Sequence, residues 1–255
     1  MNKTNLQIRI ESTKAEGRMA RIPFITAGFP TMEKFRQAVR ELDANGADII
    51  EIGIPFSDPV ADGPIVEEAS RRVLAKGLTL PLVMEELTKL IPELKAGIVL
   101  MGYYNPFLQY GLNQLVQDAS HIGIEGFIVP DLPLEEGKSF QKLLKNKGMD
   151  LIALVGPNTP ESRLSEYAAE SSGYVYVVSV MGVTGVRNNL PPEIEETLAR
   201  VKKAFRIPVA LGFGISHPDQ LKNINTPPDA LVFGSALLAH IDQGKSAAEF
   251  MQRWL

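Results

Sequence analysis

The stretch ADIIEIGIPFSDPVADGP, residues 47–64, joins a short apolar run to a loop rich in proline, glycine and aspartate. Successive side chains of a strand point to opposite faces of a sheet. Ile50 and Ile52 therefore share one face with Ile54, and Glu51 lies on the other face. A nearly continuous apolar run is typical of a parallel strand that is covered on both sides. The stretch thus predicts a buried parallel strand with its isoleucines against helices and one carboxylate pointing inward.

Seven more runs of this kind occur along the chain, each ended by glycine, proline or a polar turn. They cover residues 22–28, 97–104, 126–132, 150–156, 174–180, 207–214 and 229–236. The segments between them carry apolar residues at helical spacing, as at Phe35, Val39 and Leu42. Eight strands alternating with helices in 255 residues predict an α/β fold, the (β/α)8 TIM barrel. A doubly wound open sheet is the alternative, but residues 26–30, TAGFP, lack the glycine-rich dinucleotide loop usual after its first strand.

Two helices are expected in addition to the eight units. One is an extra N-terminal helix in residues 2–15, and the other is an extra helix after the second βα unit in residues 79–91. No linker rich in proline, glycine and serine divides the chain. We therefore expect residues 1–255 to form a single barrel domain.

The composition limits the kinds of partner and of chemistry. The formal net charge is -4, so neither nucleic acid nor an anionic membrane is expected as a partner, since both are captured by basic surfaces. The absence of cysteine excludes disulfides, zinc–thiolate sites and a thiol nucleophile. The chain shows no signal peptide and no apolar run near the ~20 residues of a spanning helix. We expect a soluble, cytoplasmic protein that binds a small molecule.

Glu51 is the first candidate catalytic residue, because the active site of such a barrel lies at the C-terminal ends of its strands. Burial of a carboxylate disfavours its ionised form and raises its pKa. A raised pKa is the property that a general acid or base needs at neutral pH. The alternative is a glutamate held in a structural hydrogen-bond network with no catalytic task.

Asp58 and Asp62 follow Glu51 in a loop that prolines and glycine shape into a defined turn. Taken alone, each aspartate is equally explained as the N-cap of a helix that begins near Gly63. Together with Glu51, they allow an acid/base group to work beside a carboxylate that stabilises developing positive charge. This pairing favours carboxylate acid/base chemistry.

Two other chemistries are disfavoured by the pattern of residues. His121, His217 and His240 are far apart and lack the spacing of a metal site. No lysine falls inside a predicted strand, which argues against an aldolase that forms a Schiff base.

Short glycine-containing segments at the predicted ends of strands six, seven and eight suggest a phosphate site. They are MGVTG at residues 181–185, GFGIS at 212–216 and FGSA at 233–236. Glycine lets phosphate oxygens approach backbone N–H groups, and a helix that starts after Gly234 and Ser235 directs its N-terminal amides at the anion. Turns and helix caps explain any one of these segments equally well, but barrels prefer phosphate near strands seven and eight.

The segment GVTGVRNNLPP, residues 182–192, has a glycine-flanked start and a polar middle. It is interpreted as a lid that closes over substrate, the alternative being a long connection with no such role. Arg187 within it either approaches the phosphate or faces solvent.

The run E-x-G-x-P-F-S-D-P-x-A-D-G-P within residues 41–64 resembles the tryptophan synthase alpha chain family. The likeness continues in the same order, almost to the end of the chain, through residues 100–107, 129–136, 179–187, 212–216 and 234–236. The resemblance implies a lyase of tryptophan biosynthesis that cleaves indole-3-glycerol phosphate to indole and glyceraldehyde 3-phosphate. It implies no cofactor in this chain, pyridoxal phosphate on a partner beta chain, transfer of indole through a tunnel, and an alpha2beta2 heterotetramer.

The resemblance also assigns roles to individual residues. Glu51 matches the proton-transferring glutamate, Asp62 the aspartate that holds the indole N–H, and Thr184 a lid residue that contacts this aspartate on closure. The indole pocket is matched by Phe24, Leu100 and Tyr176, each otherwise explained by core packing, and the phosphate site by Gly185, Gly214, Gly234 and Ser235. The lid start reads Ser179, Val180, Met181 and Gly182, which departs from many family members.

The family docks its beta chain through the loops after strands two and three, here residues 55–61 and 103–109. Phe56, Tyr104 and Phe107 either form this interface or pack locally. Two other functions stay open from the residues: another phosphate-binding barrel enzyme, such as an isomerase or a standalone indole-releasing lyase, and a phosphate-binding regulatory subunit.

Overall fold

The computed structural model describes residues 3–178, 193–212, 214–215, 217–221 and 224–254. Its strands are all parallel and follow the order β5-β4-β3-β2-β1-β9-β8-β7-β6. They are β1 (Ala20–Thr26), β2 (Ile49–Gly53), β3 (Gly97–Met101), β4 (Ile124–Ile128), β5 (Asp150–Leu151), β6 (Ala153–Val155), β7 (Val175–Val178), β8 (Val209–Gly212) and β9 (Ala230–Phe233).

The two ends of this strand order are one stretch of chain, because only Ile152 separates β5 from β6. The N–H of Ile152 donates to the carbonyl of Phe127 on β4 at 2.9 Å, so hydrogen bonding to β4 continues at the residue between β5 and β6. The ring of strands is thereby closed, which confirms the predicted barrel. The fifth predicted strand, 150–156, is correct in place but interrupted at its third residue.

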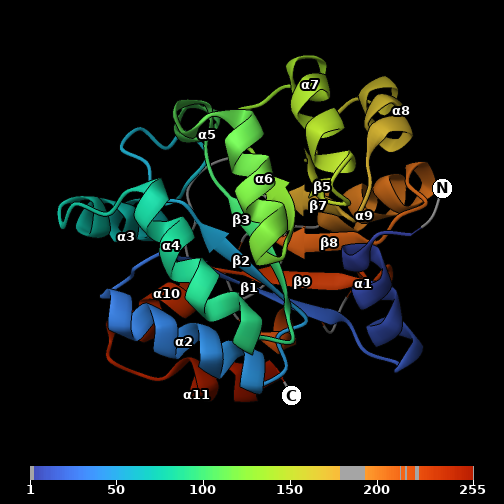
Figure 1. Ribbon diagram of the computed structural model, residues 1–255. Helices are drawn as coiled ribbons and strands as arrows, with labels where there is room; N and C mark the ends of the chain where they lie inside the picture. The colour runs from blue at the N-terminus through green and yellow to red at the C-terminus, as the bar shows by residue number, and fades with distance from the viewer. Residues whose placement is uncertain (1–2, 179–192, 213, 216, 222–223, 255) are drawn as a thin grey trace.

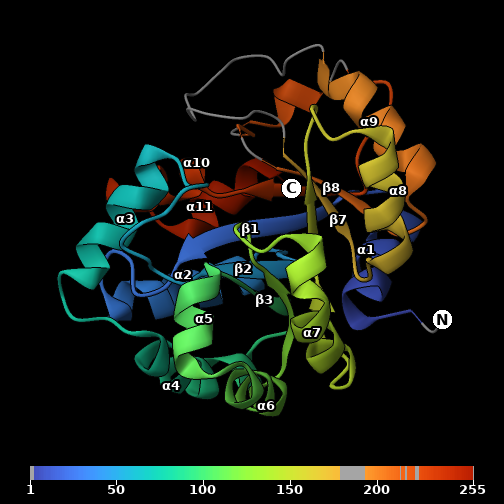
Figure 2. The same ribbon diagram turned by 90° about the horizontal axis from the view of Figure 1, so that it is seen from above.

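Helices surround the strands on all sides in both views (Figure 1, Figure 2). They are α1 (Asn5–Ala15), α2 (Met32–Ala44), α3 (Pro64–Leu74), α4 (Leu80–Leu90), α5 (Tyr104–Tyr110), α6 (Leu112–Ile122), α7 (Leu134–Lys145), α8 (Glu161–Glu170), α9 (Glu193–Ala204), α10 (Ser235–Asp242) and α11 (Ala247–Met251). Short 3₁₀ turns are η1 (Ile91–Glu93), η2 (Pro218–Leu221) and η3 (Gln252–Trp254). The predicted extra helices are confirmed as α1 and α4. Within the described residues, no helix has the length and apolar character needed to cross a membrane.

The third strand ends earlier than predicted, at Met101, and Tyr104 begins the unpredicted helix α5. Gly102 marks the change of direction, because a Cβ there would lie 2.7 Å from the ring of Phe107. The Phe107 ring is fully buried and packs edge-on against Phe127. The predicted run 97–104 therefore combined a strand with the first turn of a helix.

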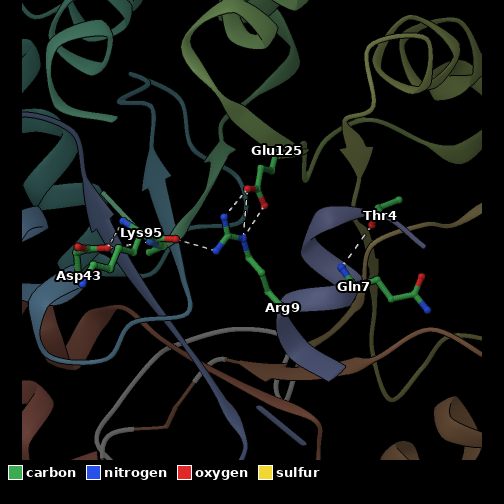
Figure 3. Close-up of polar contacts among 7 residues, drawn as sticks. Thr4, Gln7, Arg9, Asp43, Lys95 and Glu125 are labelled. Atoms are coloured by element: carbon green, nitrogen blue, oxygen red, sulfur yellow. Dashed lines mark hydrogen bonds and ion pairs between the residues drawn. The ribbon is translucent and has the colours of Figure 1, made fainter. Parts of the chain in front are cut away.

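The N-terminal ends of the strands form a closed base beneath the barrel. Helix α1 packs there through Leu6 and Ile10, both fully buried. The Arg9 guanidinium of α1 donates to both carboxylate oxygens of Glu125 on β4 and, at 2.7 Å, to the carbonyl of Lys95 (Figure 3). This packing leaves the opposite end of the barrel for the functional site.

Candidate active site

Glu51 lies in the middle of β2 and is fully buried. It is paired with Phe24 on β1 and with Val99 on β3, and its side chain lines a cavity inside the barrel. Ile50 and Ile52 on either side of it are also fully buried, within the apolar core. The inward direction expected from the alternation of β2 is thus what the structure shows.

Among the described residues, one hydrogen bond holds the Glu51 carboxylate. The Tyr174 hydroxyl, also fully buried, donates to Oε1 at 2.9 Å. The second oxygen, Oε2, is buried and has no hydrogen-bond partner among the described residues. Burial raises the pKa of Glu51 to about 8, and the hydrogen bond from Tyr174 offsets part of that rise. At neutral pH the carboxyl group is therefore mostly protonated.

Asp62 lines the same cavity from the loop between β2 and α3. Burial raises its pKa to about 6, while a hydrogen bond from Tyr103 and the charge of Glu67 act in opposite directions. The Tyr103 hydroxyl also accepts the N–H of Ala61 at 3.0 Å, so it fixes both the carboxylate and the loop backbone. At neutral pH Asp62 is mostly ionised, in contrast to Glu51.

The N-cap alternative for the loop aspartates is not what the structure shows. Gly63 occupies the N-cap of α3, and no side chain caps that helix end. Asp58 is exposed and accepts a hydrogen bond from its neighbour Ser57, away from the cavity lining. Of the two aspartates, Asp62 is the one that shares a cavity with Glu51.

The cavity has an empty volume of about 810 Å³, including its open mouth. Its wall is mainly apolar, which suits a flat aromatic group, and a few polar groups interrupt it. The lining residues are Phe24, Glu51, Asp62, Gly63, Ile65, Val66, Met101, Tyr176, Gly214, Ile215, Val232, Phe233, Gly234, Ser235, Ala236 and Ala239.

Two aromatic walls depend on glycines at the ends of neighbouring strands. A Cβ at Gly53 would lie 2.4 Å from the Phe24 ring, and one at Gly234 would lie 2.9 Å from the same ring. A Cβ at Gly212 would lie 2.1 Å from the Tyr176 hydroxyl. These positions are closed to any larger residue unless a ring moves, because real Cβ contacts are never so short. Gly234, predicted for phosphate alone, thus also makes room for Phe24.

The prediction that Leu100 lines the indole pocket is wrong. Leu100 is fully buried but does not line the cavity, whereas its neighbour Met101 does. Register explains the difference, because Glu51 pairs with Val99 and Gly53 pairs with Met101, so Leu100 falls on the other face of β3. Phe24 and Tyr176, the other two predicted wall residues, both line the cavity.

The predicted phosphate residues that the structure describes lie together at one part of the cavity wall. Gly214, Gly234 and Ser235 all line it, and α10 begins at Ser235 with Gly234 as its N-cap. Gly214 has φ +79°, a conformation that favours glycine. Thr184, Gly185, Arg187, the proposed lid at 182–192 and its start at 179–182 lie outside the described residues.

A protonated and an ionised carboxyl group in one apolar cavity can perform two different tasks at the same pH. The protonated Glu51 is able to donate a proton, and the ionised Asp62 is able to stabilise a cation. This division of roles is set by the environment of each group. It is the arrangement needed to protonate an electron-rich ring and hold the resulting positive charge.

Comparison with known proteins decides the family. The family model described as "Tryptophan synthase alpha chain" matches residues 10–254. The chain belongs to the tryptophan synthase alpha chain family.

Curated relatives and solved structures agree with this membership. The tryptophan synthase alpha chain of Nitratidesulfovibrio vulgaris (strain DP4) is 59% identical over 254 residues, which cover 100% of this chain and 99% of the relative. A Mycobacterium tuberculosis tryptophan synthase structure matches with a TM-score of 0.91 at 30% identity, covering 99% of this chain and 96% of that one. A tryptophan synthase complex from Pyrococcus furiosus matches with a TM-score of 0.82 at 33% identity, covering 91% of this chain and 94% of that one.

Sequence reasoning missed several residues of the site, among them Met101, Tyr103 and Tyr174. Tyr103 follows β3 directly, so its position at a strand end was an available signal. Tyr174 precedes β7 and meets Glu51 across 123 residues of sequence, a contact that only the closed ring reveals.

Proposed function

We propose that Glu51 and Asp62 carry out the cleavage of indole-3-glycerol phosphate in this chain, the lyase subunit of tryptophan biosynthesis. The observation that supports this most strongly is the pair itself. Two carboxyl groups line one cavity, one with a pKa of about 8 and the other with a pKa of about 6. At a pH between these two pKa values, Glu51 is mostly protonated and Asp62 is mostly ionised.

The reaction begins with proton transfer from Glu51 to C3 of the indole ring, which gives an indoleninium cation. The bond between C3 and the glycerol carbon then breaks, and its electron pair returns to the ring. The hydroxyl on that carbon loses its proton to the Glu51 carboxylate and becomes the aldehyde of glyceraldehyde 3-phosphate. One proton leaves Glu51 and one returns, so the enzyme is unchanged and the products are indole and the aldehyde.

Asp62 accepts the indole N–H and stabilises the positive charge on that nitrogen while C3 is protonated. Its ionised state at neutral pH supports this role. Tyr103 positions Asp62 by donating to its carboxylate, while the same hydroxyl holds the loop at Ala61.

The remaining substrate contacts follow the cavity wall. The indole ring lies between Phe24, Met101 and Tyr176, and the phosphate lies against the backbone of Gly214, Gly234 and Ser235 at the start of α10. Thr184 and Gly185 lie outside the described residues, and their contacts with substrate stay a prediction from the family resemblance.

A beta chain docks over the loops that follow β2 and β3. Val60 in the loop after β2 is 82% exposed, Leu108 in helix α5 after β3 is 51% exposed, and both are apolar. The Phe56 ring packs at a tilt against the ring of Tyr103, which holds Asp62, so this surface is continuous with the site. Phe107, by contrast, is fully buried and packs locally. We propose an alpha2beta2 heterotetramer in the cytoplasm, built from this chain as one domain without a cofactor and a beta chain that carries pyridoxal phosphate.

The test is an assay of indole and glyceraldehyde 3-phosphate release from indole-3-glycerol phosphate, with the purified chain alone and with a beta chain. Wild type should release both products in equal amounts, faster with the partner. Asp62→Asn should lower kcat by about 100-fold or more, through loss of the cation's partner. Asp58→Asn, an exposed aspartate of the same loop, serves as the matched control and should retain turnover by the chain alone.

Undiminished turnover by Asp62→Asn would reject the mechanism. Stimulation of the beta chain without release of indole by either preparation would instead support the regulatory-subunit alternative.

A further inference from the structure

A second buried carboxylate with an unpaired oxygen lies near the base of the barrel. Asp150 begins β5 and is 1% exposed. Its Oδ2 is buried and accepts no hydrogen bond of ordinary geometry from the described residues, although the Thr4 side chain also acts on the carboxylate. A buried acid with an unsatisfied oxygen is costly to the fold, so its retention calls for a physical reason.

Asp150 is in direct contact with the segment that leads into β7. The Ser172 hydroxyl donates to Oδ1 at 2.5 Å. Oδ2 lies 2.7 Å from the place where a Cβ of Gly173 would be, and Gly173 has φ +74°. The Asp150 carboxylate therefore packs on the bare Cα of Gly173, and it accepts a hydrogen bond from Ser172, the residue before Gly173.

Tyr174 is the next residue along the chain, and it is the donor to Glu51. The direction of its ring depends on the backbone at residues 172–173, which Asp150 holds. Tyr174 is fully buried, and burial together with the charges of Glu51 and Asp150 raises its pKa well above the ordinary value. It therefore stays protonated and acts as a permanent donor.

We infer that Asp150 is a positioning residue for Glu51, acting through Ser172 and Tyr174. The inference rests on the proposed function of Glu51 and adds a residue to it. Asp150 holds the backbone from which the Tyr174 hydroxyl reaches Oε1, and so fixes the direction of the carboxyl group that transfers the proton.

The ionisable groups near Asp150 do not disturb its hydrogen bond with Ser172. Glu125 on β4 is the carboxylate that acts on Asp150, and it is itself paired with Arg9 of α1. Burial raises the pKa of Asp150, while hydrogen bonds from Ser172 and Thr4 act against this. In either protonation state Oδ1 remains able to accept the Ser172 hydroxyl.

The test combines kinetics with a titration of the Glu51 carboxyl carbon by ¹³C NMR, assigned with Glu51→Gln. Asp150→Ala should lower kcat by about 10-fold with little change in KM, because substrate contacts are untouched. Loss of the Tyr174 donor should raise the pKa of Glu51 by roughly one unit. Asp150→Asn should restore most of kcat, since its amide oxygen still accepts from Ser172.

Two controls separate positioning from general loss of structure. Asp229→Ala removes another partly buried carboxylate from the base, one that binds Lys14 and Val209 instead, and should leave the Glu51 titration unchanged. Adding Asp150→Ala to Tyr174→Phe should lower kcat no further than Tyr174→Phe alone. If Asp150→Ala does not fold, Ser172→Ala takes its place with the same expected shift.

The inference is overturned if a folded Asp150→Ala or Ser172→Ala protein keeps the wild-type kcat and Glu51 titration. It also fails if the effects of Asp150→Ala and Tyr174→Phe add fully, or if Asp229→Ala shifts Glu51 equally. The titration needs no turnover, so a wild-type chain that releases no indole would reject the proposed function and still leave this connection measurable.

Discussion

The two ends of the barrel shift the pKa of an aspartate in opposite directions. At the base, Asp229 accepts hydrogen bonds from Lys14 at 2.8 Å and from the N–H of Val209 at 2.9 Å. Desolvation raises its pKa, but the hydrogen bonds from Lys14 and Val209 and the nearby Lys202 outweigh that effect and keep the pKa below the ordinary value. At the mouth, Asp62 receives a hydrogen bond from the neutral Tyr103, and burial raises its pKa to about 6.

Two buried or half-buried glutamates, Glu51 on β2 and Glu125 on β4, differ in the same way in their hydrogen-bond partners. Glu125 at the base receives two donors of Arg9, whereas Glu51 inside the barrel receives one neutral hydroxyl. Pairing with a cation stabilises the ionised form and with it the fold, while burial without a cation keeps a proton available. The cation-paired carboxylates Asp229 and Glu125 at the base thus serve stability, whereas Glu51 and Asp62, buried without a cation, are suited to chemistry at a cost in stability.

The largest expected effect is on turnover. Glu51→Gln should lower kcat by about 1000-fold or more, because the amide cannot transfer the proton. Glu125→Gln, the matched change at the base, should leave kcat within a few-fold of wild type once the protein is folded. Steady-state indole release measures both, and equal losses in the two variants would remove the distinction between base and mouth.

A smaller effect concerns stability and its dependence on pH. The folded pKa of Glu51 is raised, so ionisation favours the unfolded chain, and wild type should lose stability as pH rises from about 4.5 towards 8. Glu51→Gln lacks this loss. The free energy of unfolding of Glu51→Gln minus that of wild type should therefore increase by roughly 3 kcal/mol between pH 4.5 and pH 7. Urea unfolding across this pH range tests it, and parallel pH curves for the two proteins would show that burial does not raise the pKa of Glu51.

The smallest effect compares the two aspartates. Asp229→Asn should lower the free energy of unfolding at pH 7 by about 1–3 kcal/mol, because its charge-assisted hydrogen bonds are lost. Its lowered pKa means that this stabilisation is present above the unfolded pKa and disappears as pH falls through the folded pKa. Asp62→Asn should leave stability unchanged or higher at pH 7. Destabilisation of both by the same amount in urea unfolding would contradict the comparison.

The fold was predictable because it depends on a local pattern. Apolar runs ended by glycine or proline located all eight barrel strands, and alternation along β2 gave the inward direction of Glu51. The break at Ile152 and the early end of β3 were missed, since both depend on how neighbours pack. At Gly102, for example, the ring of Phe107 occupies the space that a Cβ atom would need.

The site was predictable where a motif carried it and less so elsewhere. Glu51 and Asp62 line the cavity as expected, but the wall residue on β3 is Met101, since which face of that strand turns inward depends on its register with β2. Tyr174 was missed because its contact with Glu51 joins opposite parts of the ring. Sequence spacing contains no information on such a contact.

The most direct test of the account is the pKa of Glu51 in the free protein, followed by carboxyl ¹³C chemical shift from pH 4 to pH 10. The account predicts a midpoint near 8, and a basic limb of kcat/KM at the same pH, because the acid is lost as the carboxyl group ionises. A midpoint near the ordinary value of 4.5 would contradict it, since Glu51 would then be ionised at neutral pH and unable to donate the proton.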